Sequence, residues 1–223
     1  MERQLIITDD QYHTLFVPEL NECYHSTRGA VRESLHVFID AGLREVSSRQ
    51  SAVGSRGLRV LEVGFGTGLN TLLTMLYAEE HKIIIYYEAL EKYPLSKEEA
   101  AMLNYPDKDK LAALHACAWE KPVQLTSGFT LCKRRIDVLE YNPDQIFDLI
   151  YFDAFAPTVQ PDLWSRELFA KLRASMSLGG ILVTYSAKGT VKNALRAAGF
   201  TVERLPGAAG KRHMIRAMNI GEG

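Results

Sequence analysis

The glycine-rich turn that follows residue 63 constrains the fold of this chain more than any other feature. An apolar run over residues 58–63 predicts a buried strand, and the pattern over residues 69–81 predicts a helix. Gly64, Gly66 and Gly68 stand between them. Such a turn lets the backbone bend sharply and lets a ligand lie against it. The segment therefore predicts an α/β fold with a ligand site at this turn.

The remaining core continues the alternation of strands and helices. Apolar runs predict strands within residues 82–90, 147–152 and 181–185, and the pattern predicts further strands over 123–126, 129–136, 200–205 and 214–217. Helices are predicted over 94–103, 107–118, 190–198 and from 165 to 175, the last ending at Gly179 and Gly180. This order predicts a mostly parallel sheet covered on both faces. The last two strands flank Pro206 and Gly207, so we expect them to pair antiparallel.

The first 57 residues form a predicted extension that packs on this core. Residues 3–8 and 13–17 read as a β-hairpin, and residues 29–41 as a helix that ends at Gly42. Residues 44–57 are rich in Ser, Arg and Gly and are predicted to be a linker. We therefore divide the chain into an extension (1–57), a core domain (58–218) and a short tail (219–223).

Composition excludes several classes of protein. Hydrophobic residues make up 47% and charged residues 24% of the 223 residues, which is typical of a soluble globular chain. No apolar run approaches the roughly 18–20 residues that span a bilayer, and acids occupy the start where a signal peptide needs an apolar core. We therefore expect a cytoplasmic protein that does not bind membranes. The three cysteines and six histidines show no metal-ligand spacing, so no metal is expected.

The glycine spacing and the next strand end indicate the kind of ligand. A dinucleotide site would place its third glycine at position 69, which is leucine, so the turn favours a nucleoside without pyrophosphate, above all S-adenosylmethionine. Glu91 follows the second strand, where a carboxylate can accept hydrogen bonds from ribose hydroxyls. Glu88, inside the strand, is the weaker candidate. For the glycine turn, the alternative is a strand-to-helix turn that binds no ligand. For Glu91, the alternative is an acid on the protein surface.

Two further acids follow later strands. Asp137 could accept from an adenine amino group with Val138 lining the ring, although a cap on the next turn is an equal alternative. Asp153 follows the wholly apolar end of the strand over 147–152, where a carboxylate is costly unless something uses it. We expect Asp153 to face the methyl donor and the incoming nucleophile, with Phe155 and Pro157 as a wall for a flat substrate. The alternative is a helix or loop cap.

A basic region closes the sequence. Residues 188–216 hold seven bases and one acid (Glu203), a balance of 7 − 1 = +6 in a chain of net charge −1. Its bases include Lys188, Lys192 and Arg196 at helical spacing, with Lys211 and Arg212 further along. They are candidates for contacts with nucleic-acid phosphates, and a solvated helix face is the alternative.

With these features, the chain resembles the MnmD family, whose members are similar to the methyltransferase half of the two-domain MnmC enzymes. The resemblance rests on residues 22–38, on the glycine turn over 61–70, and on 91–95, 147–164, 179–187 and 206–217. It implies a class I S-adenosylmethionine-dependent methyltransferase with a Rossmann-like sheet. It also implies methylation of the amine of 5-aminomethyluridine, with or without 2-thiolation, at the wobble position in the tRNA anticodon region.

The resemblance also implies the residues of the site. The cofactor contacts would be Gly64, Phe65, Gly66, Thr67, Gly68, Asn70, Glu91, Lys92, Asp137 and Val138. The catalytic residue would be Asp153. Substrate contacts would come from Tyr24, His25, Ser26, Glu33, Phe155, Pro157, Lys188, Lys192, Arg196, Lys211 and Arg212. Because this chain differs from MnmC in lacking the flavin domain, we expect other enzymes to supply the free aminomethyl form.

The chemistry of an amine acceptor adds one expectation. A primary alkylamine is protonated at neutral pH, and an ordinary aspartate, with a pKa of about 3.9, is a weak base. We therefore expect Asp153 to orient the amine while water takes its proton. Three alternatives remain open: a methyltransferase for small-molecule amines, an aminopropyltransferase-like enzyme, and an RNA-binding protein of this fold without catalysis.

Overall fold

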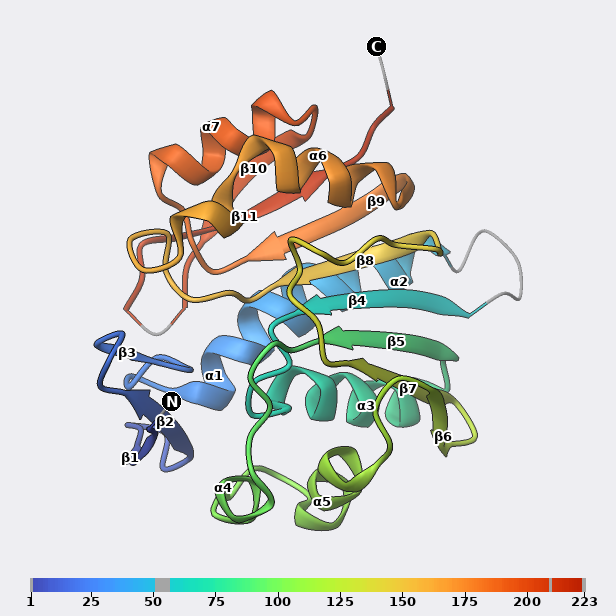
Figure 1. Ribbon diagram of the computed structural model, residues 1–223. Helices are drawn as coiled ribbons and strands as arrows, with labels where there is room; N and C mark the ends of the chain where they lie inside the picture. Colours follow the sequence, from blue (N-terminus) through green and yellow to red (C-terminus); the bar gives the residue numbers. More distant parts are fainter. Residues whose placement is uncertain (1, 51–56, 209, 222–223) are drawn as a thin grey trace.

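The computed structural model describes residues 2–50, 57–208 and 210–221, and its strands form two sheets (Figure 1). The larger sheet has the strand order β10-β11-β9-β8-β4-β5-β7-β6. Its strands are β4 (Leu58–Val63), β5 (Ile85–Leu90), β6 (Pro122–Thr126), β7 (Phe129–Arg134), β8 (Phe147–Phe152), β9 (Met176–Thr184), β10 (Thr201–Pro206) and β11 (His213–Met218). The smaller sheet holds β1 (Gln4–Ile7), β2 (His13–Val17) and β3 (Glu22–Cys23).

The five central strands of the larger sheet run parallel, as the sequence predicts. β11 lies antiparallel between β9 and β10, and β6 is antiparallel to β7. In the centre, Val63 pairs with Leu90 on one side and with Phe152 on the other. Three parallel strands therefore end at one level, and the residue after each end lies at the same edge of the sheet.

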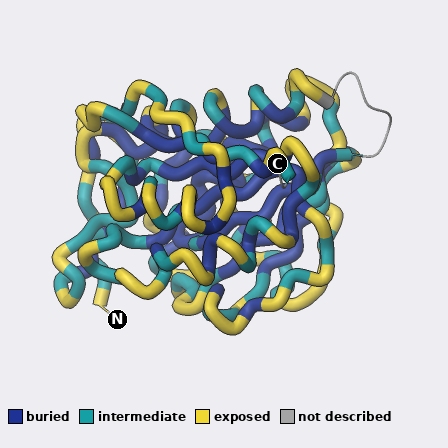
Figure 2. Tube along the Cα trace, turned by 90° about the horizontal axis from the view of Figure 1, so that it is seen from above, coloured by how far each residue is buried: buried dark blue, intermediate teal, exposed yellow. Residues whose placement is uncertain are grey.

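Helices cover both faces of this sheet. Side chains alternate along β8, so Leu149 and Tyr151 pack with α3 (Leu69–His81), while Ile150 and Phe152 pack with α6 (Arg166–Ala174) and α7 (Gly189–Ala197). Figure 2 shows the buried segments running through the middle of the molecule, with exposed segments around them. The short helices α4 (Lys97–Ala101) and α5 (Lys108–Ala116) and the 3₁₀ turn η2 (Pro161–Trp164) complete the core domain.

The extension differs from the prediction in its helical part. The hairpin β1–β2 is confirmed, and β3 adds a third strand. The predicted stop at Gly42 is wrong, because α1 (Ala30–Ser34) continues as a π-helix, η1 (Leu35–Arg44), and then as α2 (Glu45–Gln50). A Cβ at Gly42 would lie 3.0 Å from a methyl carbon of Val183, so this glycine permits close packing on the sheet. The predicted linker is therefore wrong over 44–50, and its residues 51–56 lie outside the described residues.

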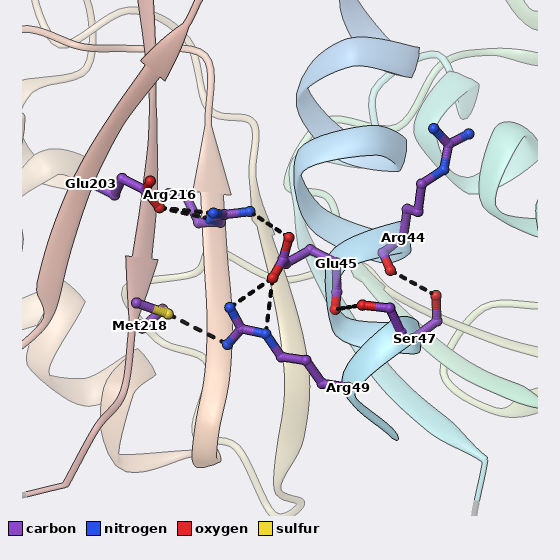
Figure 3. Close-up of polar contacts among 8 residues, drawn as sticks. Arg44, Glu45, Ser47, Arg49, Glu203, Arg216 and Met218 are labelled. Carbon is purple, nitrogen blue, oxygen red and sulfur yellow. Dashed lines mark hydrogen bonds and ion pairs between the residues drawn. The ribbon is translucent and has the colours of Figure 1, made fainter. Parts of the chain in front are cut away.

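An ion-pair network fastens α2 to the edge of the sheet (Figure 3). Arg216 on β11 pairs with Glu45 at 2.9 Å and with Glu203 on β10 at 2.8 Å. Glu45 also pairs with Arg49 at 2.7 Å, one helical turn further on. Arg216 thus joins three segments that are distant in sequence, which explains why a polar, serine-rich stretch is helical here.

The predicted helix end at Gly179 and Gly180 is also wrong. α6 ends at Ala174, and both glycines lie inside β9, where Gly179 has a φ of 79° and the register against β8 shifts. A glycine in a strand often marks such an irregularity rather than a helix stop. Among the described residues, no helix is both long and apolar enough to cross a bilayer.

Candidate active site

A cavity of about 840 Å³ lies where β4, β5 and β8 end, between the sheet edge and the extension. Its volume is within the usual range for small-molecule sites. Most of the residues predicted for the site line it: Tyr24, His25, Ser26, Glu33, Gly64, Phe65, Gly66, Thr67, Asn70, Glu91, Lys92, Asp137, Val138, Asp153, Phe155 and Lys211. Gly68, Pro157, Lys188, Lys192, Arg196 and Arg212 do not.

The glycine turn needs its glycines for reasons of conformation and of space. Gly64 has a φ of 94°, and a Cβ there would lie 2.6 Å from the carbonyl oxygen of Asp153. Gly66 has a φ of 49°, and its Cβ would lie 2.9 Å from the ring of Tyr24. A larger residue at either position would push Asp153 or Tyr24 away. The turn therefore keeps the acid after β8 and the ring from the extension close to the same point.

Glu91 is hydrogen-bonded to this turn and lines the cavity beside it. One carboxylate oxygen accepts a hydrogen bond from the backbone N–H of Gly66 at 2.8 Å, and the other accepts from the N–H of Tyr93 at 2.7 Å. These two bonds fix the carboxylate at the cavity wall, and each oxygen can accept a further hydrogen bond. Glu88, by contrast, is buried and bonds to Arg134 and Tyr141, so its role is structural.

Asp137 caps the turn that follows it, as one of the two alternatives predicts, and it also lines the cavity. Its side chain accepts from the N–H of Leu139 at 2.9 Å, which caps the turn, and it pairs with the exposed Lys92 at 2.9 Å. The hydrogen bond from Lys92 is the strongest influence that lowers the pKa of Asp137, against the opposing effect of burial. Val138 is buried beside it and contributes an apolar patch to the cavity.

These residues fit an S-adenosyl nucleoside. Glu91 offers fixed acceptors for ribose hydroxyls, Asp137 an acceptor for an amino group, and Val138 an apolar surface for a flat ring. The glycine turn presents backbone without side chains beside them. The residues that would hold the cofactor are therefore those of the turn together with Glu91, Asp137 and Val138.

Asp153 stands at the point where the cavity meets the end of β8. Its backbone N–H bonds to the carbonyl of Val63, and its Oδ2 accepts from the amide nitrogen of Asn70 at 2.8 Å. Burial raises the pKa of Asp153 to about 7, and Glu33 acts in the same direction, while Asn70 and Lys211 oppose it. The expectation of an ordinary, weakly basic aspartate is therefore wrong. A carboxylate with this pKa can accept a proton near neutral pH.

Three side chains hold the backbone that follows Asp153. Tyr185 donates its hydroxyl to the carbonyl of Ala154 at 2.9 Å, and the indole N–H of Trp164 bonds to the carbonyl of Phe155 at 2.9 Å. Gln160 accepts from the N–H of Phe155 at 3.2 Å. These bonds fix Phe155 as a wall of the cavity. Pro157, predicted to share that wall, lies in the next turn and does not line the cavity.

The extension supplies the opposite wall. The ring of Tyr24 meets the ring of Phe155 edge to face at 5.1 Å between centroids. The hydroxyl of Tyr24 accepts from Arg3 at 3.0 Å, and Arg3 also pairs with Glu99 at 3.1 Å. Burial lowers the pKa of His25 to about 4, so its ring is neutral in the free protein near pH 7. This segment of the extension therefore forms part of the cavity wall.

Lys211 has a different position from the one expected. Its ammonium pairs with the carboxylate of Glu33 and lies 4.1 Å from the centre of the Tyr185 ring. Glu33 is buried, and its second oxygen accepts from the N–H of Ser26 at 3.1 Å. Lys211 thus faces into the cavity, and its ammonium is already paired with a carboxylate, so it is not placed for the predicted contact with a nucleic-acid phosphate.

The other predicted bases lie outside the cavity. Lys188 precedes α7 and is exposed, Lys192 on that helix is half-buried, and Arg196 is exposed. Arg212 is exposed beside Lys211. All four side chains therefore belong to the C-terminal basic region and lie at the surface, outside the cavity.

Sequence reasoning missed two residues near Asp153. Tyr185 follows β9, so a search of every strand end for polar side chains would have found it. Glu62 lies inside β4, and no local signal marks it. It is fully buried, accepts from Thr71 at 2.8 Å, and has one carboxylate oxygen without a hydrogen-bond partner among the described residues. Burial raises the pKa of Glu62 to about 8.

Within the described residues, no group of three or more His, Cys, Asp or Glu side chains could hold a metal ion.

The parallel sheet, the glycine turn after β4 and the acid after β5 together define a class I S-adenosylmethionine-dependent methyltransferase. The chain belongs to a family of S-adenosyl-L-methionine-dependent methyltransferases, whose sequence model matches residues 87–220. It is similar to the "tRNA 5-methylaminomethyl-2-thiouridine biosynthesis bifunctional protein MnmC" of Pseudomonas fluorescens (30% identity, 90% of this chain, 32% of the relative). The protein of the same description from Aromatoleum aromaticum is 32% identical over 96% of this chain and 35% of the relative.

The chain therefore spans about a third of the length of these curated relatives. Among solved structures, MNMC2 from Aquifex aeolicus superposes with a TM-score of 0.79 and 23% identity, covering 98% of this chain and 70% of that one. The carbon methyltransferase of CurJ gives a TM-score of 0.54 at 16% identity, covering 89% of this chain and 57% of that one. These likenesses confirm the predicted methyltransferase fold.

Proposed function

We propose that this methyltransferase methylates the amine of 5-aminomethyluridine at the wobble position of tRNA, giving 5-methylaminomethyluridine. The observation that carries the proposal is the placement of two carboxylates, Asp153 and Glu33, in one cavity with the glycine turn. Carboxylates suit a cationic amine. The curated relatives are named for the biosynthesis of 5-methylaminomethyl-2-thiouridine in tRNA, a nucleoside that contains such a methylated amine.

The residues of the chain account for the steps of the transfer. When bound, S-adenosylmethionine supplies an electrophilic methyl group and leaves as S-adenosylhomocysteine. Asp153 accepts a proton from the substrate ammonium, because its raised pKa of about 7 suits this exchange. Asn70 holds the carboxylate in place, and the Tyr24–Phe155 contact keeps water from the acceptor. Most of the catalysis is then positioning of the amine.

The surface bases support a nucleic-acid partner. Lys188, Lys192, Arg196 and Arg212 belong to the same basic region, and their side chains do not line the cavity. We propose that these side chains contact tRNA phosphates while one nucleobase of the tRNA enters the cavity. The protein would act in the cytoplasm, where tRNA is modified, on an aminomethyl group supplied by other enzymes.

Mass analysis of wobble nucleosides tests the proposal. In cells that lack this protein, 5-aminomethyluridine should accumulate and its methylated form should disappear. A gene for the intact chain should restore the methylated nucleoside, and the Asp153→Ala variant should not. Unchanged nucleosides in the deleted strain would favour a small-molecule amine as the acceptor.

A second assay separates the remaining alternatives. The purified chain is mixed with S-adenosylmethionine and tRNA from the deleted strain, and the tRNA mass is measured. A gain of one methyl group supports the proposal. Binding of both partners without a mass change would point to a non-catalytic RNA-binding protein, and transfer of an aminopropyl group to a different kind of enzyme.

A further inference from the structure

The contact between Lys211 and Glu33 places a primary ammonium inside the acceptor side of the cavity. The lysine comes from the turn between β10 and β11, and the glutamate from α1, so 178 positions separate the partners. The ammonium also lies over the face of Tyr185, 4.1 Å from the ring centre. A carboxylate and an aromatic face together form a binding site for an alkylammonium ion.

The two partners differ in how firmly they are held. The side chain of Glu33 is 8% exposed, and the N–H of Ser26 fixes one of its oxygens at 3.1 Å. The side chain of Lys211 is 38% exposed, and its flexible stem starts from a surface turn. If the pair separates, the ammonium of Lys211 can therefore move into water and be hydrated there. Glu33 cannot move out in the same way and would remain buried without a counter-ion. Glu33 is the fixed part of the pair, and Lys211 is the exchangeable part.

The site is also close to the reacting group. Tyr185, which lies under the ammonium, donates its hydroxyl to the carbonyl of Ala154, the residue next to Asp153. Glu33 and Lys211 are both near enough to act electrostatically on Asp153. A cation bound between Glu33 and Tyr185 therefore lies beside the carboxylate to which we assign proton transfer.

We propose that Glu33 and the face of Tyr185 bind the protonated amine of the substrate, and that Lys211 occupies this site until the substrate displaces it. The end of a lysine side chain, a methylene carrying an ammonium, is the same group as the 5-aminomethyl substituent. Glu33 then determines specificity for a cationic acceptor, and Lys211 neutralises Glu33 in the free protein. This inference rests on the proposed function, because it takes an aminomethyl group as the acceptor.

The test compares two tRNAs that differ only in the amine: one with 5-aminomethyluridine and one with unmodified uridine at the wobble position. Their dissociation constants are measured without S-adenosylmethionine, and the ratio gives the preference for the amine. The intact chain should prefer the aminomethyl tRNA. In Glu33→Gln the preference should fall roughly tenfold, since only Asp153 then remains to attract the amine. In Lys211→Met it should rise roughly tenfold, because the substrate no longer competes with an internal cation.

Arg212→Met is the matched control, since it removes the neighbouring exposed charge. It should weaken both tRNAs equally and leave the ratio unchanged. The double variant Glu33→Gln/Lys211→Met avoids an unpaired buried carboxylate, so it keeps the test valid if Lys211→Met alone does not fold. Its preference should likewise fall roughly tenfold below that of the intact chain.

Two results would overturn the inference. One is a Glu33→Gln or double variant that keeps the preference of the intact chain. The other is a Lys211→Met variant that weakens both tRNAs equally, as Arg212→Met does, since Lys211 would then be a phosphate contact. Failure of the proposed function looks different, because the intact chain would neither prefer nor methylate the aminomethyl tRNA.

Discussion

The side-chain amide of Asn70 donates a hydrogen bond of 2.8 Å to Oδ2 of Asp153. Asn70 is the second residue of α3, and Asp153 directly follows β8, so this bond joins the glycine turn to the reacting carboxylate. A change at either residue therefore affects how the acceptor amine is held.

The first prediction concerns these two residues. Asp153→Ala should lower turnover on aminomethylated tRNA by at least about a hundredfold, because this variant can neither accept the proton nor position the amine. Asn70→Ala should cost roughly tenfold, the effect of one hydrogen bond to a charged group. Affinity for S-adenosylmethionine, measured by calorimetry, should change little in Asp153→Ala. Asn142→Ala, at an exposed asparagine that does not line the cavity, is the control and should turn over normally. Near-normal turnover of Asp153→Ala would show that the assignment is wrong.

The second prediction concerns pH. Burial raises the pKa of Asp153 to about 7, and only the ionised carboxylate can accept a proton. The value of kcat/KM should therefore rise as the pH increases through about 7 and then level off. The hydrogen bond from Asn70 lowers the pKa of Asp153, so Asn70→Ala should move this rise to higher pH. The measurement is kcat/KM between about pH 5.5 and 9, a range that spans the expected midpoint. An unchanged midpoint in Asn70→Ala would contradict the role of the hydrogen bond.

The positions of the main site residues can be predicted because they follow strands that are easily identified. Glu91 and Asp153 come directly after β5 and β8, and parallel strands end at one edge of a sheet. The glycine at 64 marks the same edge for β4. The pattern of apolar residues is therefore sufficient to bring together three segments that are far apart in the chain.

The errors have physical causes. Gly42 and Gly179 each suggest a helix stop, but glycine also permits close packing, as at Gly42, and a strand irregularity, as at Gly179. The pairing of Lys211 with Glu33 depends on how the β10–β11 turn meets the extension, which no local pattern records. The pKa of Asp153 depends on its burial by those same segments.

The third prediction concerns stability. Burial raises the pKa of Glu62 to about 8, from an ordinary value of 4.5. Between these values the folded protein retains a proton that the unfolded chain has released, so the free energy of unfolding falls as the pH rises. The decline is at most about 1.4 kcal/mol per pH unit for one such group. Asp153 adds to it at the lower end of this range.

Glu62→Gln removes this titration while keeping the shape of the side chain. The variant should lose less stability than the intact chain between about pH 5 and 8, measured by urea denaturation at each pH. Glu80→Gln, an exposed residue on α3, is the control and should keep the original slope. Parallel curves for the intact chain and Glu62→Gln would show that Glu62 is ionised in the folded protein at neutral pH.

The last prediction concerns the surface bases near α7. Each phosphate that a protein neutralises releases bound counter-ions, so affinity for tRNA should fall as salt increases. Lys188→Gln/Lys192→Gln should weaken tRNA binding and make the slope of log affinity against log salt less steep, by about 0.7 to 0.9 for each phosphate that the variant no longer neutralises. The matched control is Lys82→Gln/Arg44→Gln, which removes two exposed charges from other parts of the surface. The control should leave the slope unchanged, since Lys82 precedes β5 and therefore lies at the opposite sheet edge from the cavity. Equal slopes in the two double variants would mean that α7 presents only a solvated face, and the tRNA would have to approach the cavity by another surface.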